Sequence, residues 1–487
     1  MVSSTSSVGV SVVTLIIIFV TKWIYRWRNP KCNGTLPPGS SGLPVIGESL
    51  QLIIPANTID VLPFIKNRLR RYGPLFRTNV AGTNIVISAD REFNHFLFQQ
   101  EDTMVVRWYL ELFEKILKEG EFRGFSDIIK YAKNLVLNHF GVKCIKQNLL
   151  SEFEQVVQKT LYSWSLQESV DLESASVAIF GEFGARKLYG RYAERSKEFT
   201  HKFVDISRAA MSFPLNIPGT TYYKCLKEKE GVMNIVRNIV NSRISNYEDS
   251  SGNNNDGDDD DDDDDMLSKT VQDMGTVDFL TPELITQLLF SFSFATYQSV
   301  SPLLAFAVKF LSENPAVLLD LIAEHDAIIK KRSDPDSSVT WEEYKSMTFT
   351  LQVVNETQRM ANTIPGFFRK AIKDINVRGY TIPAGWGIMA CTSAQHLDPN
   401  LYEDPLKFNP WRWKEYEAEF ICKNLTPFGE GKKQCAGADF SRAAMCIFLH
   451  VLVSKYRWTI VKGGDFVQNP MLHFKNGLYI SVTARQD

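Results

Sequence analysis

The sequence predicts a mainly α fold with small β-sheets, an α+β arrangement, preceded by a single N-terminal transmembrane helix. Three observations support this prediction. Apolar residues recur mostly at helical spacing between positions 138 and 246. A long apolar segment follows Thr281-Pro282-Glu283, a sequence typical of a helix start. A nearly continuous apolar run also covers residues 8–25.

The apolar run at residues 8–25 has the length of a membrane span. Its helix would cover about 27 Å, which matches the hydrocarbon thickness of an endoplasmic reticulum bilayer. Lys22 lies near the end of this run, Arg26, Arg28 and Lys31 follow it, and the preceding residues 1–7 are uncharged. The positive-inside rule therefore predicts a short luminal tail at residues 1–7 and a cytosolic C-terminal side. A cleaved signal peptide is the alternative, but the basic segment and small-residue cleavage site that it requires are missing.

The remaining chain is predicted to form one large domain, residues 48–487, after a basic flank and Pro-rich hinge at residues 26–47. Residues 248–265 are predicted to form an acidic disordered loop, in which Asp256 and the unbroken run 258–265 supply nine Asp side chains. Apart from these nine, 54 basic residues face 47 of the 56 acidic ones, a net charge of +7. This mildly basic body suits an acidic protein partner or a membrane surface. Dense basic stripes are missing, which excludes a nucleic-acid partner.

Two further elements can be assigned locally. Residues 77–88 alternate in polarity around Gly82, which predicts a β-hairpin. The apolar segment after Thr281 extends to about residue 314 and predicts a helix of about 50 Å. Thr281 is expected to cap its N-terminus, with Pro282 in the first turn. Polar residues within this helix argue against a second membrane span, so we expect a helix inside a large core.

A glycine-rich loop near the C-terminus places Cys435 just before a predicted helix. Backbone N–H groups and the helix N-terminus stabilise a thiolate at such a position. A thiolate is the axial ligand that helps haem iron to cleave an O–O bond. A buried, inert cysteine is the alternative. The joint spacing of Phe428, Gly431, the basic Lys433, Cys435 and Gly437 would arise by chance in about one chain in ten thousand at average residue usage.

This loop resembles the haem-binding signature FxxGxRxCxG of the cytochrome P-450 superfamily, and the resemblance extends over nearly the whole chain. Glu356 and Arg359 match the ExxR motif of the family, and Arg412 matches the third partner of that pair. The resemblance implies that these three residues form a structural lock beneath the haem. The stretches PPGSSGLPVIGESLQL, VTWEEYKSMTFTLQVVNET and FNPWRWK are most similar to the plant branch that oxidises sterols and triterpenoids.

The resemblance also implies the cofactor site. Haem b is expected to have its iron bound by Cys435 and to contact Phe428. The haem propionates are expected to bind Lys433, Arg369 and Lys133. Lysine replaces the usual arginine at two of these positions, and it can satisfy a carboxylate as a point charge without the bidentate fork.

The central helix departs from the pattern of the family, in which a carboxylate and a threonine guide protons to the oxygen being activated. Gln298 and Ser299 occupy the aligned positions and are the candidate catalytic residues. Gln298 cannot titrate and can only hold water by hydrogen bonds, whereas Ser299 retains a hydroxyl. Pro302 leaves the Gln298 carbonyl without its helical partner, so we expect a kink or an inserted water. Alternatively, Pro302 only bends a helix that is already distorted in the family.

The resemblance implies a monooxygenase in the endoplasmic reticulum membrane, with its catalytic domain in the cytosol. An NADPH–cytochrome reductase would deliver electrons from NADPH. The substrate would be a large apolar molecule, a sterol, steroid or triterpenoid of plant specialised metabolism. A haem-thiolate isomerase or lyase without external electrons, and a catalytically silent haem-binding protein, are the alternatives. Aromatic and aliphatic residues are the candidate pocket walls: Trp108, Phe113, Phe292, Ala295, Ile364, Phe367, Leu472 and Phe474.

Overall fold

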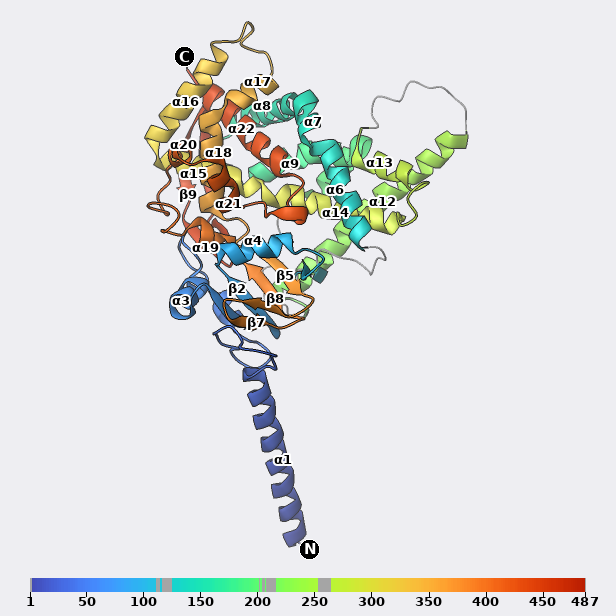
Figure 1. Cartoon of the computed structure of the whole chain (residues 1–487). Helices are drawn as coiled ribbons and strands as arrows, with labels where there is room; N and C mark the ends of the chain where they lie inside the picture. The colour runs from blue at the N-terminus through green and yellow to red at the C-terminus, as the bar shows by residue number, and fades with distance from the viewer. Residues whose placement is uncertain are drawn as a thin grey trace.

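The computed structural model describes residues 2–110, 114–115, 125–200, 202–203, 206, 216–252 and 264–486. For residues 2–11, 13, 125, 197, 249–252, 298 and 299 it describes the backbone alone. These parts of the chain confirm the predicted mainly α fold with small β-sheets (Figure 1).

Helices occur along the whole length of the described chain. Those of the N-terminal half are α1 (Val2–Arg28), α2 (Ser49–Leu52), α3 (Pro63–Tyr72), α4 (Arg91–Gln99), α6 (Phe125–Phe140), α7 (Val142–Cys144), α8 (Leu150–Ser165), α9 (Leu172–Tyr189), α10 (Ala193–Thr200) and α12 (Thr221–Gly252). Those of the C-terminal half are α13 (Met266–Asp273), α14 (Pro282–Ser299), α15 (Ser301–Glu313), α16 (Pro315–Ile329), α17 (Trp341–Ser346), α18 (Thr348–Ala361), α19 (Thr392–His396), α20 (Arg412–Glu415), α21 (Ala418–Asn424) and α22 (Ala438–Lys455). The main hydrophobic core lies among α8, α9, α14, α15, α18 and α22.

The strands form small sheets at the edge of this helical core. They are β1 (Leu75–Val80), β2 (Thr83–Ser88), β3 (Val105–Arg107), β4 (Val170–Asp171), β5 (Phe367–Ala371), β6 (Ile375–Val377), β7 (Tyr380–Ile382), β8 (Gly387–Ala390), β9 (Tyr456–Gly463), β10 (Phe466–Gln468), β11 (Leu472–Phe474) and β12 (Leu478–Ala484). The largest sheet has the order β1-β2-β8-β5-β3, and smaller sheets pair β4-β12-β9, β10-β11 and β6-β7.

The largest sheet joins two distant parts of the chain. The predicted hairpin is confirmed, because β1 and β2 pair antiparallel around Ala81 and Gly82, whose φ angles are 50° and 82°. Two positive φ values are typical of the tight turn that matches strand twist. β8 then pairs parallel with β2 and antiparallel with β5, so the segment after α18 completes the N-terminal sheet.

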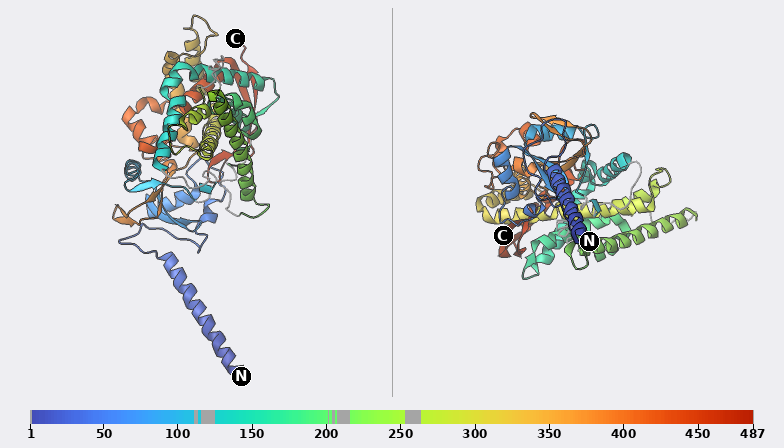
Figure 2. Two further views of the ribbon diagram at one scale, coloured as in Figure 1. Left: turned by 90° about the vertical axis from the view of Figure 1, so that its right-hand side faces the viewer. Right: turned by 90° about the horizontal axis from the view of Figure 1, so that it is seen from below.

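The N-terminal helix α1 projects away from the body beside this sheet (Figures 1 and 2). Within the described residues, no single helix is long and apolar enough to cross a membrane. The segment Pro282–Glu313, which contains α14 and α15, is bent by 110° from α16 (Pro315–Ile329). Only taken together do these two segments have the length and apolar composition of a membrane span. The predicted hinge is attached to the sheet, because the Arg77 N–H donates to the Pro38 carbonyl at 2.8 Å and the Ser40 N–H donates to the Arg77 carbonyl at 3.3 Å.

The predicted single helix after Thr281 is divided at Val300 into α14 and α15, which together cross the body (Figure 2). Thr281 caps it as predicted, because its side chain accepts the Leu284 N–H at 3.2 Å. The break at Val300 lies where a kink or an inserted water was expected, and the choice between these two stays a prediction. Proline supplies no N–H, and the Ser301 hydroxyl donates to the Tyr297 carbonyl at 2.9 Å, a contact that bends helices.

Candidate functional site

The loop that precedes α22 is closed by its own backbone. The Cys435 N–H donates to the Phe428 carbonyl at 3.0 Å, and a short 3-10 turn lies between the two residues. Within that turn Gly431 has a φ of 70°, and a Cβ there would lie 2.5 Å from the Phe98 carbonyl oxygen. Only glycine fits this position, so the contact with α4 fixes the path of the chain to Cys435.

The Cys435 thiol is subject to opposing effects. Burial raises its pKa, whereas the Gly437 N–H and the positive charges of Arg107, Arg442 and Lys133 lower it. Burial is the larger effect, so the loop alone leaves the thiol more protonated than usual. A cationic partner at the sulfur would reverse this balance, because a coordinating metal ion deprotonates a thiol.

Cys435 lines a pocket inside the body. Apolar side chains from α15, from the segment after α18 and from the cysteine loop form much of its wall. They are Val300, Leu303, Ile364, Phe367, Pro427 and Phe428. Polar side chains also reach it, from α18, α22 and the segments between them: Gln358, Asn362, Thr363, His396 and Ser441. The pocket therefore combines one thiol with a largely apolar wall.

The predicted wall residues do not all line this pocket. Ile364 and Phe367 line it, whereas the ring of Phe474 packs against Phe306 at 4.9 Å within the main core. Leu472 is buried in the same core. Phe292 packs against the core from α14, and Ala295 is exposed. The Trp108 ring meets Phe368 edge-on at 6.0 Å. Phe113 lies outside the described residues.

The predicted propionate-binding cations lie around the cysteine loop, each with a protein partner. Lys133 donates to the Lys432 carbonyl at 3.1 Å, and the Lys433 ammonium lies 3.6 Å from an Asp102 oxygen. Arg369 is buried and forms an ion pair with Glu101. Sequence reasoning missed Arg107, which donates to the Lys433 carbonyl at 3.3 Å. No local signal distinguishes Arg107, because only the fold brings β3 to this loop.

The candidate catalytic residues, Gln298 and Ser299, end α14 at the break beside Val300. Their side chains lie outside the described part of the structure, so their proton-relay role stays a prediction. The neighbouring Val300 lines the same pocket as Cys435, which places the break in α14 and α15 next to the pocket.

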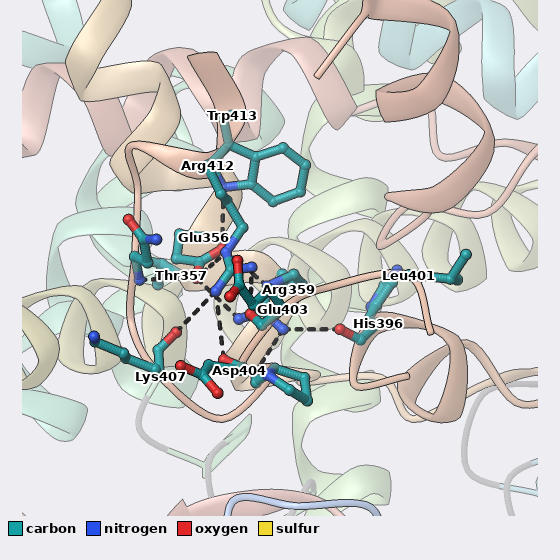
Figure 3. Close-up of polar contacts among 12 residues, drawn as sticks. Glu356, Thr357, Arg359, His396, Leu401, Glu403, Asp404, Lys407, Arg412 and Trp413 are labelled. Carbon is teal, nitrogen blue, oxygen red and sulfur yellow. Dashed lines mark hydrogen bonds and ion pairs between the residues drawn. The ribbon is translucent and has the colours of Figure 1, made fainter. Parts of the chain in front are cut away.

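Glu356 and Arg359 of the ExxR motif and their partner Arg412 form a hydrogen-bonded network (Figure 3). Arg359 contacts both Glu356 oxygens at 2.9 Å, and the Arg412 Nε contacts one of them at 3.1 Å. Sequence reasoning missed two further donors to the same carboxylate, the Trp413 indole and the Asn409 N–H, each at 3.0 Å.

Arg359 extends this network toward the pocket. Its Nη1 donates to the carbonyls of His396 at 2.8 Å and Pro405 at 2.7 Å. His396 also lines the pocket, so one residue connects the network with the candidate site. The triad predicted from Glu356, Arg359 and Arg412 is thus assembled, although its relation to a bound haem stays a prediction.

The model of the family Cytochrome P450 matches residues 37–480. The chain belongs to the cytochrome P450 family. It is 42% identical over 483 residues to cucurbitadienol 11-hydroxylase from Siraitia grosvenorii, covering 99% of this chain and 100% of that one. It is also 42% identical over 482 residues to beta-amyrin 16-alpha-hydroxylase CYP87D16 from Maesa lanceolata, covering 98% of each. These comparisons identify a P450 monooxygenase, an oxidoreductase.

A solved structure supports the fold. The retinoic acid bound cyanobacterial CYP120A1 has a TM-score of 0.78 to this cytochrome P450 at 21% identity. The match covers 93% of this chain and 100% of the other. At this identity the likeness concerns the fold alone.

The family implies a haem cofactor, and the residues of this cytochrome P450 fit one. The donor set is a single thiol, Cys435, that faces a pocket with apolar walls. Arg107, Lys133 and Lys433 lie at the same loop and could hold two carboxylates. Iron at the sulfur would keep the thiol deprotonated against the effect of burial.

Proposed function

We propose that this cytochrome P450 hydroxylates or further oxidises a large apolar substrate, a triterpenoid or a sterol, with electrons from NADPH. The pocket next to Cys435, with its largely apolar wall, is the observation that supports this proposal. The two relatives support the substrate class, since their names describe hydroxylation of cucurbitadienol and beta-amyrin.

The residues of the chain have separate tasks in this proposal. Bound haem supplies the chemistry that activates dioxygen. Cys435 ligates its iron, and the Gly437 N–H stabilises the thiolate. Ile364 and Phe367 exclude water and orient the substrate by apolar contact. Ser299 passes protons through its hydroxyl, and Gln298 holds water.

Reconstitution with a purified NADPH–cytochrome reductase tests this function. The full-length protein is incubated with a panel of triterpenoids and sterols while NADPH consumption and products are measured. We expect an oxidised product that requires both NADPH and dioxygen, and reductase without this protein is the control. A rearranged product that forms without NADPH would favour the isomerase or lyase. No product from any substrate, together with an intact haem spectrum, would favour the silent protein.

We also propose that residues 8–25 anchor the protein in the endoplasmic reticulum membrane, with the catalytic domain in the cytosol. Within α1, Leu15 is 65% exposed and Phe19 is 72% exposed, and neither packs against the body. Four basic residues at positions 22–31 favour the cytosolic side. Deletion of residues 1–28 is expected to move at least part of the protein into the soluble fraction with its haem spectrum unchanged. If the truncated protein stayed entirely in the membrane fraction after extraction with alkaline carbonate, the anchor assignment would be contradicted.

We further propose that electrostatic attraction guides the encounter of the reductase with this protein. The body outside the acidic run has a net charge of +7, which complements an acidic reductase surface and accelerates the encounter. Turnover at limiting reductase is expected to fall between about 10 mM and about 150 mM salt, as the Debye length shortens from about 30 Å to about 8 Å. Turnover that does not depend on salt would contradict charge-guided docking, and saturating reductase provides the control.

A further inference from the structure

Glu101 is a buried carboxylate between α4 and β5. Its side chain has no exposed surface, and its Oε1 accepts from the Nε of Arg369. The other oxygen, Oε2, has no hydrogen-bond donor among the groups that the structure describes. An unpaired buried oxygen costs free energy, and the cost is higher for a charged group. Packing alone therefore does not account for a carboxylate at this position.

Arg369 faces a second cation across the sheet. β3 and β5 pair antiparallel with Arg107 directly opposite Arg369. Side chains opposite each other lie on the same face, where like charges repel. Burial, and then repulsion from Arg107, lower the pKa of Arg369, whereas Glu101 acts in the other direction. Glu101 therefore compensates the charge of Arg369, which is next to that of Arg107.

Two residues of this charged cluster, Arg107 and Asp102, also contact the cysteine loop. Arg107 donates to the carbonyl of Lys433, two residues before Cys435, and its charge acts on the Cys435 thiol. Asp102, the residue after Glu101, faces the Lys433 ammonium at 3.6 Å. The adjacent carboxylates of Glu101 and Asp102 thus pair with Arg369 and Lys433, respectively.

We propose that Glu101 is a positioning residue that holds Arg369 and, through Arg369 and Arg107, sets the reduction potential of the haem bound at Cys435. The inference rests on haem binding in the proposed function. A fixed negative charge in a poorly screened interior stabilises the more positive, oxidised iron. Loss of this charge makes the iron easier to reduce.

A spectroelectrochemical titration of the full-length haem protein tests the proposal. Glu101→Gln keeps the shape and an oxygen acceptor for Arg369 but removes the charge, so its reduction potential shifts to a more positive value. Glu101→Asp keeps the charge, so its potential stays near that of the wild type. The matched control is Glu48→Gln. Glu48 is also a buried carboxylate, paired with Arg68 at 2.5 Å, but it lies away from the cysteine loop and leaves the potential unchanged.

A Glu101→Gln protein with a wild-type potential and only a lower melting temperature overturns the proposal. If this variant does not fold, Arg369→Gln replaces it. That substitution leaves the Glu101 charge uncompensated and shifts the potential to a more negative value, and an unchanged potential again overturns the proposal. The titration needs no substrate. A protein that oxidises no tested substrate but shows these shifts would refute the proposed substrate oxidation and support the role of Glu101.

Discussion

Two charged clusters lie next to the pocket and differ in how completely they are paired. In the network around Glu356, both carboxylate oxygens have several donors, and the side chains of Glu356 and Arg359 have no exposed surface. Around Glu101, one carboxylate oxygen has no donor among the described groups, and Lys433 approaches Asp102 only to 3.6 Å. The charged groups of the first cluster are fully hydrogen-bonded to one another, which is typical of a structural element. The charged groups of the second cluster are only partly paired.

The difference follows from the tasks of the clusters. A buried ion pair is strongly destabilised when one partner is removed, so a complete network holds its segments in one arrangement. A cluster that binds an anionic group must keep cations that are not fully neutralised by the protein. Substitutions in the two clusters are therefore expected to affect different properties, the first the folded state and the second the cofactor.

The largest effect is expected from Glu356→Ala. The substitution leaves Arg359 and Arg412 buried without their carboxylate, which costs about 3–5 kcal/mol of folding free energy. Urea unfolding, followed by tryptophan fluorescence and by the haem absorption, would measure it. Glu419→Ala is the control, because that carboxylate is exposed and pairs only with Lys423. Equal unfolding midpoints for the two variants would contradict the structural role of the network.

Cys435→Ala is expected to affect the cofactor and not the fold. The Cys435 side chain opens onto the pocket, so its truncation removes few contacts and circular dichroism should keep the wild-type helical signal. The reduced carbon monoxide band of a thiolate-ligated haem and all product formation should disappear together. Cys422→Ala, at an exposed cysteine on α21, should keep both. A Cys435→Ala protein that retained the thiolate band would exclude Cys435 as the ligand.

The sequence predicted the elements whose signals are local. The Thr281 cap, the hairpin around Gly82 and the pairing of Glu356 with Arg359 depend on residues close together in the chain. Arg412 was added by family resemblance and lies where the resemblance implies. Spacing and side-chain chemistry are sufficient for features of this kind.

The remaining contacts depend on segments that are distant in the chain. The pairing of β3 with β5 places Arg107 opposite Arg369, and no periodicity of either strand encodes that register. The buried position of Glu101 and the indole donor of Trp413 follow from the same long-range packing. The assignment of Arg369 to a propionate did not include its protein partner, because a carboxylate 268 positions away gives no local signal.

His396 lies between the Glu356 network and the pocket, and its ring predicts a pH dependence of stability. Its Nδ1 bonds to the Asn362 side-chain oxygen at 2.8 Å, and its Nε2 accepts the Thr426 N–H at 3.0 Å. Burial, and then the charge of Arg359, lower its pKa from 6.5 to about 3. The neutral ring therefore contributes stability that is complete above about pH 6.5 and is lost as the pH falls toward 3. The unfolding free energy should decrease by up to about 1.4 kcal/mol per pH unit in that window.

Urea unfolding at several pH values between about 7 and 5 measures this slope. His396→Asn is expected to make it shallower, and His473→Asn, at an exposed ring, is the control. Some slope should remain, because burial also lowers the pKa of His450 to about 3. A slope unchanged by His396→Asn would show that this ring does not titrate during unfolding.

The smallest effect is expected from a substitution of Ser299. The fold should stay intact, and only the share of NADPH electrons that ends in product should change. An amide at Gln298 cannot ionise, so the Ser299 hydroxyl and water are predicted to carry the proton relay. Ser299→Ala should then lower the product formed per NADPH and raise the hydrogen peroxide released. Ser291→Ala is the control, because this serine lies on the same helix and its hydroxyl donates to the Gln287 carbonyl at 2.8 Å.

Gln298→Glu sharpens the same test, because it supplies a carboxylate at the position where the sequence pattern of the family predicts one. Higher turnover would show that the missing acid limits proton delivery. A carboxylate that is buried without a partner costs several kcal/mol, and in that case the variant would lose stability without gaining turnover. The ratio of product to NADPH decides between these outcomes. If Ser299→Ala leaves that ratio at the wild-type value, the hydroxyl only packs within the helix, and protons reach the pocket by a path that does not include Ser299.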